Sequence, residues 1–244
     1  MDALPLRPVE LTEELRAQLS TTSTATLTAQ LQRRGIRSTF LSGLRPTRPD
    51  LRLLGYARTL RYVPLREDLQ PVLGGIASAQ RRAVETIDPD DVLVIEARGE
   101  TDAATIGDIF TMRILKRGGA GIVTDGALRD TPGITAIDVA VYHRASHAAT
   151  LGRLHLPLDN DVPVACAGVL VMPGDIMVGD GEGVMVIPAA LVHEVARDAA
   201  QQEAEETFAL ERVAAGESSI GVFPLAKERR AEFDAWLADR GKRP

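Results

Sequence analysis

The segment VLVIEARGETDAATIGDIFTMRILKRGGAGIVT (residues 92–124) has the pattern of a strand, a helix and a second strand. VLVIEA (92–97) and AGIVT (120–124) are short, almost wholly apolar runs, which are typical of strands covered on both faces. RGETDAATI (98–106) is expected to be a loop, and GDIFTMRILKRGG (107–119) a helix that ends at its glycine pair. Because parallel strands need a crossover of this kind, the segment predicts a βαβ unit and an α/β fold.

Helices are expected before and after this unit in the sequence. The stretches with helical patterns are ELTEELRAQL (10–19), STATLTAQLQRRG (23–35), a segment after Gly74–Gly75, residues 189–215 and AKERRAEFDAWLADR (226–240). In the last of these, Phe233, Trp236 and Leu237 share one face. That face either closes the same body or docks on a neighbouring subunit.

Strands are expected between the helical stretches. LRLLGYARTLRYVP (51–64) predicts strands that are broken near Gly55, and residues 140–187 hold several short apolar runs separated by Gly, Pro and Asp. VMPGD (171–175) and GDGEG (179–183) are turn sequences that predict a β-hairpin or meander. The acidic residues of these turns are interpreted as turn formers rather than catalytic groups: Asp175, Asp180 and Glu182.

The composition narrows the class of protein. A chain of 244 residues with 45% hydrophobic and 25% charged residues suits one globular domain. A net charge of −6 and an aromatic content of 4% argue against a nucleic-acid partner. No apolar run has the length of a membrane span, and the first residues lack a signal-peptide pattern, so no membrane partner and a cytoplasmic location are expected. The single cysteine, Cys166, is expected to be a small buried hydrophobe.

Charged residues follow both strands of the βαβ unit. In a right-handed unit the carboxyl ends of both strands lie at one edge of the sheet, where α/β proteins bind ligands. Asp108 follows the first strand, and Arg129 and Asp130 follow the second in DGALRD, where Gly126 would allow a tight turn. The topology therefore predicts that these side chains meet. Two alternatives stay open: Asp108 is only a helix N-cap, and Arg129–Asp130 is only a solvated loop pair.

The residue types suit an anion held beside a metal ion. The N–H groups of Ile109 and Phe110 at the start of a helix attract an anionic group, and the Arg129 guanidinium can bind a carboxylate with two hydrogen bonds. Asp130 is a hard oxygen ligand, and one or two carboxylates with waters suit Mg²⁺ or Mn²⁺ rather than Zn²⁺. We therefore expect a 2-oxo acid substrate, which chelates the cation while an enolate forms.

The helix expected over residues 189–215 carries acidic residues beside its apolar stripe. The stripe consists of Leu191, Val195, Ala199, Ala209 or Leu210, and Val213. Gln202 and Glu206 lie on the stripe, and Glu203 lies on its flank. A carboxylate on an apolar face needs a partner or a function, unless the helix leaves the body there and the stretch is solvated.

GDIFTMRILKRGGAGIVTDGALRD (107–130) resembles the signature of the RraA-like family, which includes class II 4-hydroxy-4-methyl-2-oxoglutarate aldolases and the regulator of ribonuclease activity A. The resemblance extends through STATLTAQLQRRG, LGYARTLRYVP, VMPGDIMVGDGEGVMVIP and LERVAAGES, roughly over residues 20–220. It implies an αββα sandwich related to the phosphohistidine swivelling β/β/α domain. Residues 1–244 would form a single domain, with 1–20 and 221–244 as peripheral helical extensions.

The resemblance also implies a role for each candidate residue. Asp130 would bind Mg²⁺ or Mn²⁺, Arg129 would bind substrate and stabilise the enolate, and Asp108 would hold metal-bound water. Gly107 and the amides of Ile109 and Phe110 would take the pyruvyl carboxylate. The family's homotrimers or hexamers place the site between subunits, where a glutamate of a neighbour's C-terminal helix, here Glu203 or Glu206, positions a water.

The function implied is a metal-dependent lyase that cleaves a 4-hydroxy-2-oxo acid to pyruvate and a second carbonyl compound, with oxaloacetate decarboxylation as a related reaction. The alternatives are a non-catalytic regulator of ribonuclease activity and another enolate reaction on a sugar-derived oxo acid. Tyr142, His143 and Arg144 stand where the family's aldolases carry a PVF-x-x-G type segment. This departure leaves the exact substrate open; His143 and His147 either contact it or are exposed loop histidines.

Overall fold

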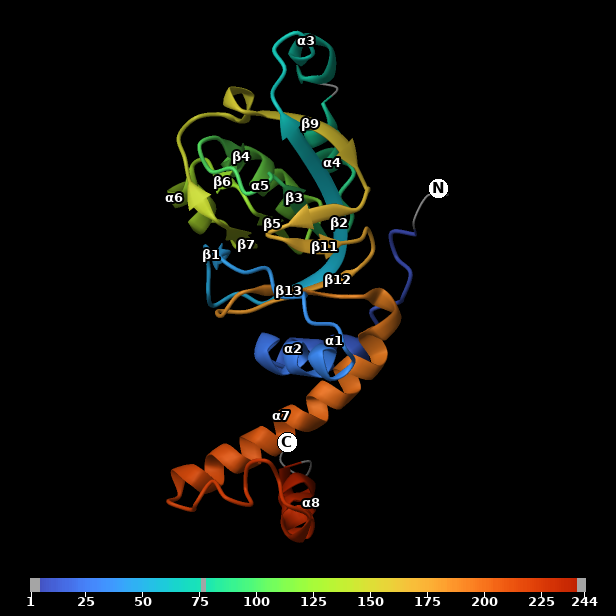
Figure 1. Cartoon of the computed structure of the whole chain (residues 1–244), viewed down its shortest axis with the longest axis vertical. Coiled ribbons are helices and arrows are strands. Elements are labelled where there is room, and N and C mark those ends of the chain that lie inside the picture. Colours follow the sequence, from blue (N-terminus) through green and yellow to red (C-terminus); the bar gives the residue numbers. More distant parts are fainter. Residues whose placement is uncertain (1–4, 76–77, 241–244) are drawn as a thin grey trace.

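The computed structural model describes residues 5–75 and 78–240, which form a mixed α/β structure (Figure 1). Its centre is an eight-stranded sheet in the order β1-β7-β5-β3-β2-β12-β13, in which β9 also pairs with β2. Residues 1–4 and 241–244, which belong to the expected terminal extensions, lie outside the described residues. The expected α/β class is confirmed.

The βαβ unit forms as the sequence predicts. β3 (Asp91–Glu96) and β5 (Gly121–Thr124) are parallel neighbours, and α5 (Asp108–Lys116) connects them. The expected loop between β3 and α5 is only partly correct, because it contains β4 (Ala104–Ile106). β4 pairs with β6 (Ala127–Leu128), which in turn pairs with β8 (Ala145–Ser146), in a small parallel sheet. This second sheet extends the carboxyl edge of the unit.

The expected break near Gly55 is wrong. β2 (Leu53–Pro64) runs without interruption, and Gly55 pairs with Met177 of β12. A Cβ atom at Gly55 would lie 2.2 Å from the carbonyl oxygen of Asp90. The glycine is therefore required because the turn before β3 passes directly over the strand, and it does not mark a bend.

Replacing Gly55 by alanine is expected to lower the free energy of unfolding by about 1–3 kcal/mol, because either Asp90 or the strand must shift. Urea unfolding followed by circular dichroism measures this loss. Gly152→Ala is the matched control, since an added Cβ would meet only the flexible end of Gln70, at 3.1 Å. Equal stability of both variants would contradict the close approach at Gly55.

The remaining strands flank this centre. β12 (Ile176–Gly179) and β13 (Val184–Ile187) form the expected hairpin, in which Asp180 accepts hydrogen bonds from the amides of Glu182 and Gly183. Asp175 accepts from the amide of Met172, so the interpretation of Asp175 and Asp180 as turn formers is confirmed. The other strands are β1 (Arg45–Pro46), β7 (Ala140–His143), β9 (His155–Asn160), β10 (Val164–Cys166) and β11 (Val169–Val171).

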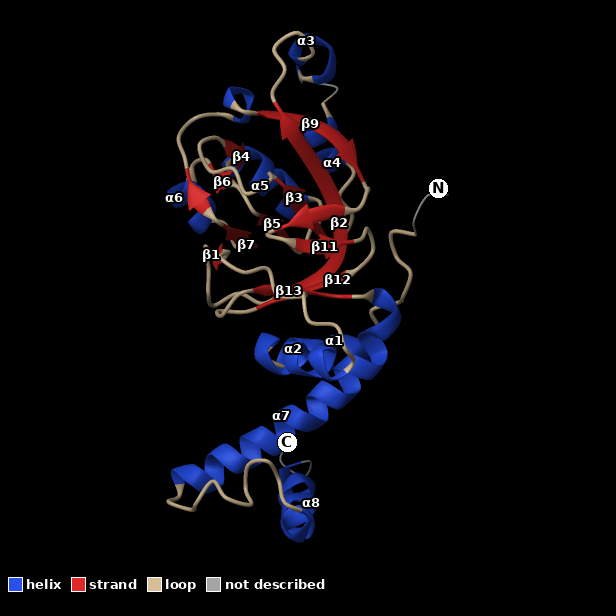
Figure 2. Cartoon of the chain, in the orientation of Figure 1, coloured by secondary structure: helices blue, strands red, loops and turns tan. Residues whose placement is uncertain are grey.

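Helices cover the sheet on more than one side. The helices not yet named are α1 (Glu13–Thr21), α2 (Thr24–Arg33), α3 (Gln70–Leu73), α4 (Ala79–Glu85), α6 (Thr131–Thr135), α7 (Val192–Ala214) and α8 (Arg230–Arg240). Short 3₁₀ turns span Leu151–Arg153, Ala189–Leu191 and Lys227–Arg229. Figure 2 shows α1, α2 and the first half of α7 beneath β12 and β13, with α4 and α5 on the side of β3.

Three apolar cores result from this layering. One lies between the sheet and the β10–β11 hairpin, and it includes Cys166, whose thiol has its pKa raised by burial. Another joins the sheet to α4, α5 and α6. The third joins β12 and β13 to α1, α2 and α7, and it contains Leu15 and Leu19 of α1. The expectation that Cys166 is a buried hydrophobe is confirmed.

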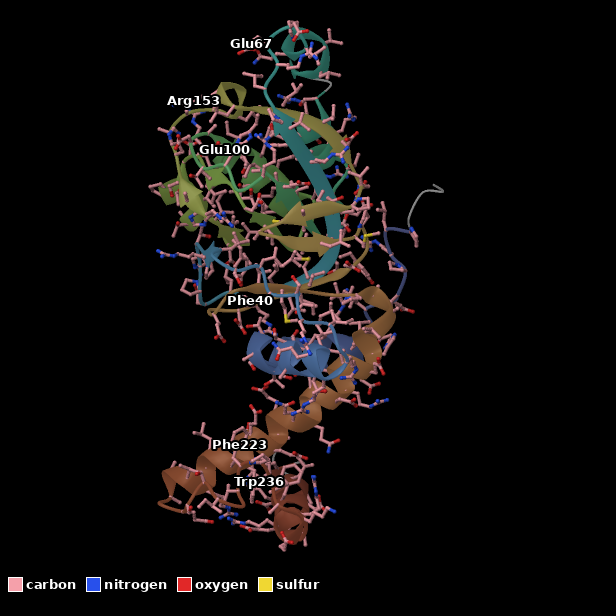
Figure 3. The ribbon with its side chains drawn as sticks, viewed as in Figure 1. Phe40, Glu67, Glu100, Arg153, Phe223 and Trp236 are labelled. Atoms are coloured by element: carbon pink, nitrogen blue, oxygen red, sulfur yellow. The ribbon has the colours of Figure 1, made fainter. Side chains whose placement is uncertain are left out.

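The far half of α7 leaves the body (Figure 1). Its residues Leu210 and Val213 are 71% and 41% exposed, so the apolar stripe expected over the whole helix ends before them. α8 packs against this half through Phe208, Phe233 and Trp236, whose ring centroids lie 5.6–5.8 Å apart. Figure 3 shows Trp236 and Phe223 beside this part of α7, well away from the sheet. We call the far half of α7 together with residues 215–240 the arm.

No helix within the described residues is long and apolar enough to span a membrane.

Candidate active site

A cavity of about 350 Å³ lies at the carboxyl edge of the small parallel sheet. The first turns of α4 and α5, the turn between β6 and α6, and the loop before β9 form its walls. Its lining residues are Gln80, Arg81, Ala104, Thr105, Ile106, Gly107, Asp108, Ile109, Phe110, Arg129, Asp130, Thr150 and Leu151. The structure thus brings Asp108, Arg129 and Asp130 to one cavity, as the topology of the βαβ unit predicts.

The start of α5 faces this cavity with free donors. Gly107 is the N-cap and has no side chain to accept from the first amides. Its carbonyl oxygen accepts from the amide of Thr111 at 3.1 Å, whereas the earlier amides of a helix have no intrahelical partner. Asp108 occupies the first helical position, so its alternative interpretation as the N-cap is wrong. The amides of Ile109 and Phe110 therefore suit a carboxylate bound at this end.

The Arg129–Asp130 pair is held by the backbone. The Arg129 amide donates to the carbonyl oxygen of Ile106 at 2.9 Å, which ties the end of β6 to β4. Asp130 adopts a left-handed conformation with φ 58° and ψ 34°, which is costly for residues other than Gly, Asn and Asp. Its carboxylate lies 3.7 Å from Nε of Arg129, and the two side chains are 49% and 40% exposed. Both side chains are half-exposed, and both line the cavity.

Two glycines make room for the carboxylates. A Cβ atom at Gly107 would lie 3.0 Å from Oδ2 of Asp130, and one at Gly133 would lie 3.2 Å from Oδ2 of Asp108. Within residues 5–75 and 78–240, no group of three or more His, Cys, Asp or Glu could hold a metal ion together. Two carboxylates beside open space fit a Mg²⁺ or Mn²⁺ ion that keeps most of its waters, and they do not fit a closed Zn²⁺ site.

Gly126 lies outside the cavity lining, and its neighbour Asp125 is a buried acid. A Cβ at Gly126 would lie 2.7 Å from both Ala97 and Thr105, so this glycine permits close packing against Ala97 and β4 in the bend between β5 and β6. Asp125 is 2% exposed and accepts from the amides of Ala97 and Gly99, at 2.6 and 3.0 Å. Sequence reasoning missed this carboxylate, although an aspartate directly after a buried strand is a signal for such a role.

The two C-terminal glutamates lie elsewhere in the chain. Glu203 accepts from the amide and hydroxyl of Ser23, the N-cap residue of α2, at 3.3 and 3.2 Å. Glu206 accepts from Gln202 at 2.7 Å. Neither residue lines the cavity, and Figure 2 shows α7 at the opposite end of the chain from α5 and β6. Their expected position in a neighbouring subunit's site stays a prediction.

The segment after β7 borders the site on one side. His147 lines an open cavity of about 630 Å³ that shares Arg129 and Asp130 with the first one. Its Nδ1 accepts from the amide of Ala149 at 3.0 Å. His143 lies in β7 opposite Arg45 of β1, and burial lowers the pKa of its ring. Of the two histidines, the structure therefore places only His147 beside Arg129 and Asp130.

Comparisons with known proteins agree with this geometry. The RraA-like model, described as Aldolase/RraA, matches residues 24–186. A Halalkalibacterium halodurans protein named "Putative 4-hydroxy-4-methyl-2-oxoglutarate aldolase" is 32% identical over 165 residues, which are 68% of this chain and 73% of that protein. Protein DlpA of Legionella pneumophila is 26% identical over 94% of this chain, but the match covers only 36% of DlpA.

Solved structures show the same fold. Streptomyces coelicolor RraAS2, described as an unusual member of the RNase ES inhibitor RraA protein family, is 34% identical with a TM-score of 0.74; the match covers 83% of this chain and 96% of that one. An uncharacterized protein from Pseudomonas syringae pv. tomato is 25% identical with a TM-score of 0.76, over 88% and 98% of the two chains. The model match and these relatives cover the βαβ unit and the cavity at its edge, and the chain belongs to the RraA-like family.

Proposed function

We propose that this protein is a divalent-metal-dependent lyase that cleaves a 4-hydroxy-2-oxo acid to pyruvate and a second carbonyl compound. The observation that carries the proposal is the cavity in which Arg129, Asp130, Asp108 and the free amides of α5 converge. The names of the aldolase relatives agree with it. Decarboxylation of oxaloacetate would use the same site, because it passes through the same pyruvate enolate.

The chain's own groups divide the work in this proposal. The amides of Ile109 and Phe110 hold the substrate carboxylate, and the Arg129 guanidinium donates to the 2-oxo oxygen, where negative charge develops. Asp130 and Asp108 are the residues that would hold Mg²⁺ or Mn²⁺ and its waters. The cation, when bound, supplies Lewis-acid stabilisation of the enolate charge. Arg129 supports the same charge from the protein side.

The experiment that tests this function measures pyruvate release from 4-hydroxy-2-oxo acids and from oxaloacetate. Purified protein should release pyruvate with Mg²⁺ or Mn²⁺ and lose the activity in EDTA, and it should regain activity when the metal is restored. Undiminished turnover in EDTA would rule out the metal-dependent mechanism. No pyruvate from any of these acids, with either metal, would rule out the lyase itself.

Arg129→Lys is expected to lower kcat/KM about 10- to 100-fold, because the flexible ammonium of a lysine does not fix its donors towards the 2-oxo oxygen as the planar guanidinium does. Lysine keeps the positive charge, so the fall in kcat/KM measures the geometry of the guanidinium donors and not the charge of the side chain. Steady-state kinetics of pyruvate release provide the measurement, with Arg33→Lys on the exposed surface of α2 as control. Full activity in Arg129→Lys would remove this residue from the substrate site.

We also propose that trimers or hexamers complete each site with Glu203 or Glu206 of a neighbour. The observation that favours this is their position on α7, a helix whose far half leaves the body. Light scattering gives the assembly state. The kcat values of Glu203→Gln and Glu206→Gln, measured separately, show which of the two glutamates takes part in the site. A fully active monomer would contradict this arrangement.

The second candidate is a non-catalytic regulator of a ribonuclease. The 34% identity to Streptomyces coelicolor RraAS2, which is described within an RNase ES inhibitor family, favours it. A regulator would not need the carboxylate of Asp130. Inhibition of a ribonuclease E-type enzyme by both the natural protein and Asp130→Asn, without any lyase activity, would favour the regulator.

A further inference from the structure

The open cavity of about 630 Å³ adjoins the first cavity at Arg129 and Asp130, the two residues that line both. In the proposed reaction the amides of Ile109 and Phe110 hold the pyruvyl end in the first cavity. The fragment beyond the bond that breaks then has the open cavity as its adjoining space. We call this space the distal cavity; its lining residues are Leu128, Arg129, Asp130, Thr131, Pro132, Thr135, Ser146, His147 and Ala148.

His147 lies at the same sheet edge as Arg129. β8 is the parallel neighbour of β6, with Ser146 opposite Leu128. The amide of His147 donates to the carbonyl oxygen of Leu128 at 2.9 Å, just as the amide of Arg129 donates to that of Ile106. The backbone thus holds His147 beside Arg129 at the carboxyl edge of the small parallel sheet, where α/β proteins bind ligands.

A backbone contact determines which nitrogen of the His147 ring carries the proton. The amide of Ala149 donates to Nδ1 at 3.0 Å, so Nδ1 carries no proton and Nε2 is the N–H donor of the ring. Within residues 5–75 and 78–240 no hydrogen bond from Nε2 to a protein atom is formed. His147 therefore offers an uncharged donor to a ligand in the distal cavity.

Hydroxyl groups of the distal cavity add further uncharged donors and acceptors. Oγ1 of Thr131 donates to Oγ of Ser146 at 2.8 Å, which leaves the proton of the Ser146 hydroxyl for a ligand. Oγ1 of Thr135 donates to the carbonyl oxygen of Thr131 at 2.9 Å, and its lone pairs remain as acceptors. Arg129 is the only lysine or arginine among the lining residues, all of which the structure describes. The distal cavity therefore suits a hydroxyl group, which donates and accepts without charge.

We propose that the distal cavity selects a neutral, hydroxylated fragment and that His147 is a specificity-determining residue, whose Nε2–H donates to the hydroxyl oxygen of that fragment. This inference rests on the proposed lyase function. There the 2-oxo acid group engages Arg129 and the divalent cation, so a second carboxylate in the distal cavity would have no cation of its own, which is costly. The preferred substrate is thus a 4-hydroxy-2-oxo acid with a hydroxylated tail, and not the substituted oxoglutarate in the names of the aldolase relatives.

Three substrates that differ only in the group attached to carbon 4 test this selection. 4,5-Dihydroxy-2-oxopentanoate carries a hydroxymethyl group there, 4-hydroxy-2-oxopentanoate a methyl group and 4-hydroxy-2-oxoglutarate a carboxylate. All three release pyruvate when the bond between carbons 3 and 4 breaks. The kcat/KM of the natural protein should be about 10-fold higher for the dihydroxy acid than for either of the others, as expected for one hydrogen bond between neutral groups. An equal or higher value for the glutarate would overturn the proposal.

Two replacements of His147 separate its ligand donor from its backbone contact. Asparagine keeps an acceptor near the position of Nδ1 and lacks the remote donor, whereas glutamine places an N–H near the position of Nε2. His147→Asn should lower kcat/KM for the dihydroxy acid about 10-fold and leave the pentanoate within about twofold, and His147→Gln should recover most of the loss. His193→Asn, which replaces an exposed histidine in the first turn of α7, should change neither value. Equal losses on both substrates in His147→Asn, or no loss on either, would overturn the proposal.

The selection and the lyase function fail separately. Pyruvate release without a preference for the dihydroxy acid would overturn the selection and leave the lyase function in place. If the natural protein cleaves none of the three acids, the lyase function fails, and the acids are then stable ligands for calorimetry in the presence of Mg²⁺. The dihydroxy acid should bind about 10-fold more tightly than the pentanoate, and His147→Asn should abolish the difference. Equal binding of these two acids by the natural protein would overturn the selection as well.

Discussion

Asp130→Asn is expected to lower metal-dependent pyruvate release about 10³-fold while the protein stays folded, which is the largest effect on activity that we expect. The carboxylate is the principal candidate metal ligand, and loss of Lewis-acid stabilisation worth several kcal/mol corresponds to about a 10³-fold fall in kcat/KM. Asparagine is the correct replacement because, like aspartate, it tolerates the left-handed backbone of this position, where φ is 58°. An alanine here would confuse the loss of the ligand with backbone strain.

The control for this variant is Asp138→Asn. Its side chain is 82% exposed, just beyond α6, and it should keep full activity. Circular dichroism of both variants shows that the fold is retained, and calorimetry with Mn²⁺ measures metal binding without turnover. If Asp130→Asn binds Mn²⁺ and turns over substrate like the natural protein, Asp130 is not the metal ligand.

Arg58→Met is expected to cause the largest loss of stability, about 3–5 kcal/mol in the free energy of unfolding. Arg58 lies in β2 with 8% of its surface exposed. It donates to Asp91 at 2.9 Å and to both carboxylate oxygens of Asp161, at 2.8 and 2.9 Å. Asp91 is 1% exposed, so removal of the guanidinium leaves a buried carboxylate without its main partner.

Arg61→Met in the same strand is the matched control. Arg61 pairs with Asp159, but the two side chains are 40% and 34% exposed, and exposed pairs contribute about 1 kcal/mol or less. Urea unfolding followed by circular dichroism compares both variants with the natural protein. Similar losses in the two variants would show that burial of the Arg58 pair does not determine its contribution.

Local patterns predict those parts of this fold that depend on neighbouring residues. The apolar runs of β3 and β5 and the helix between them are visible in the sequence, and the topology alone predicts that Asp108 meets Arg129 and Asp130. The reason for Gly55 is not visible, because it lies in the approach of Asp90 from another turn. β4 has three residues and is therefore too short to give a strand pattern.

Partners far apart in the sequence limit the prediction of the site. Glu203 looks like a misplaced carboxylate on α7, and its partner Ser23 is 180 positions away. Such roles depend on tertiary contacts, and neither composition nor periodicity contains them.

The arm has a consequence for how unfolding is observed. It buries few apolar side chains, chiefly Phe208 and Phe233, and α8 packs against α7. A segment with so small a core opens at a lower free energy than the sheet, as a separate cooperative unit. The chain's single tryptophan, Trp236, belongs to this unit. Its fluorescence therefore reports sub-global opening of the arm, whereas backbone signals from the strands report the loss of the whole fold.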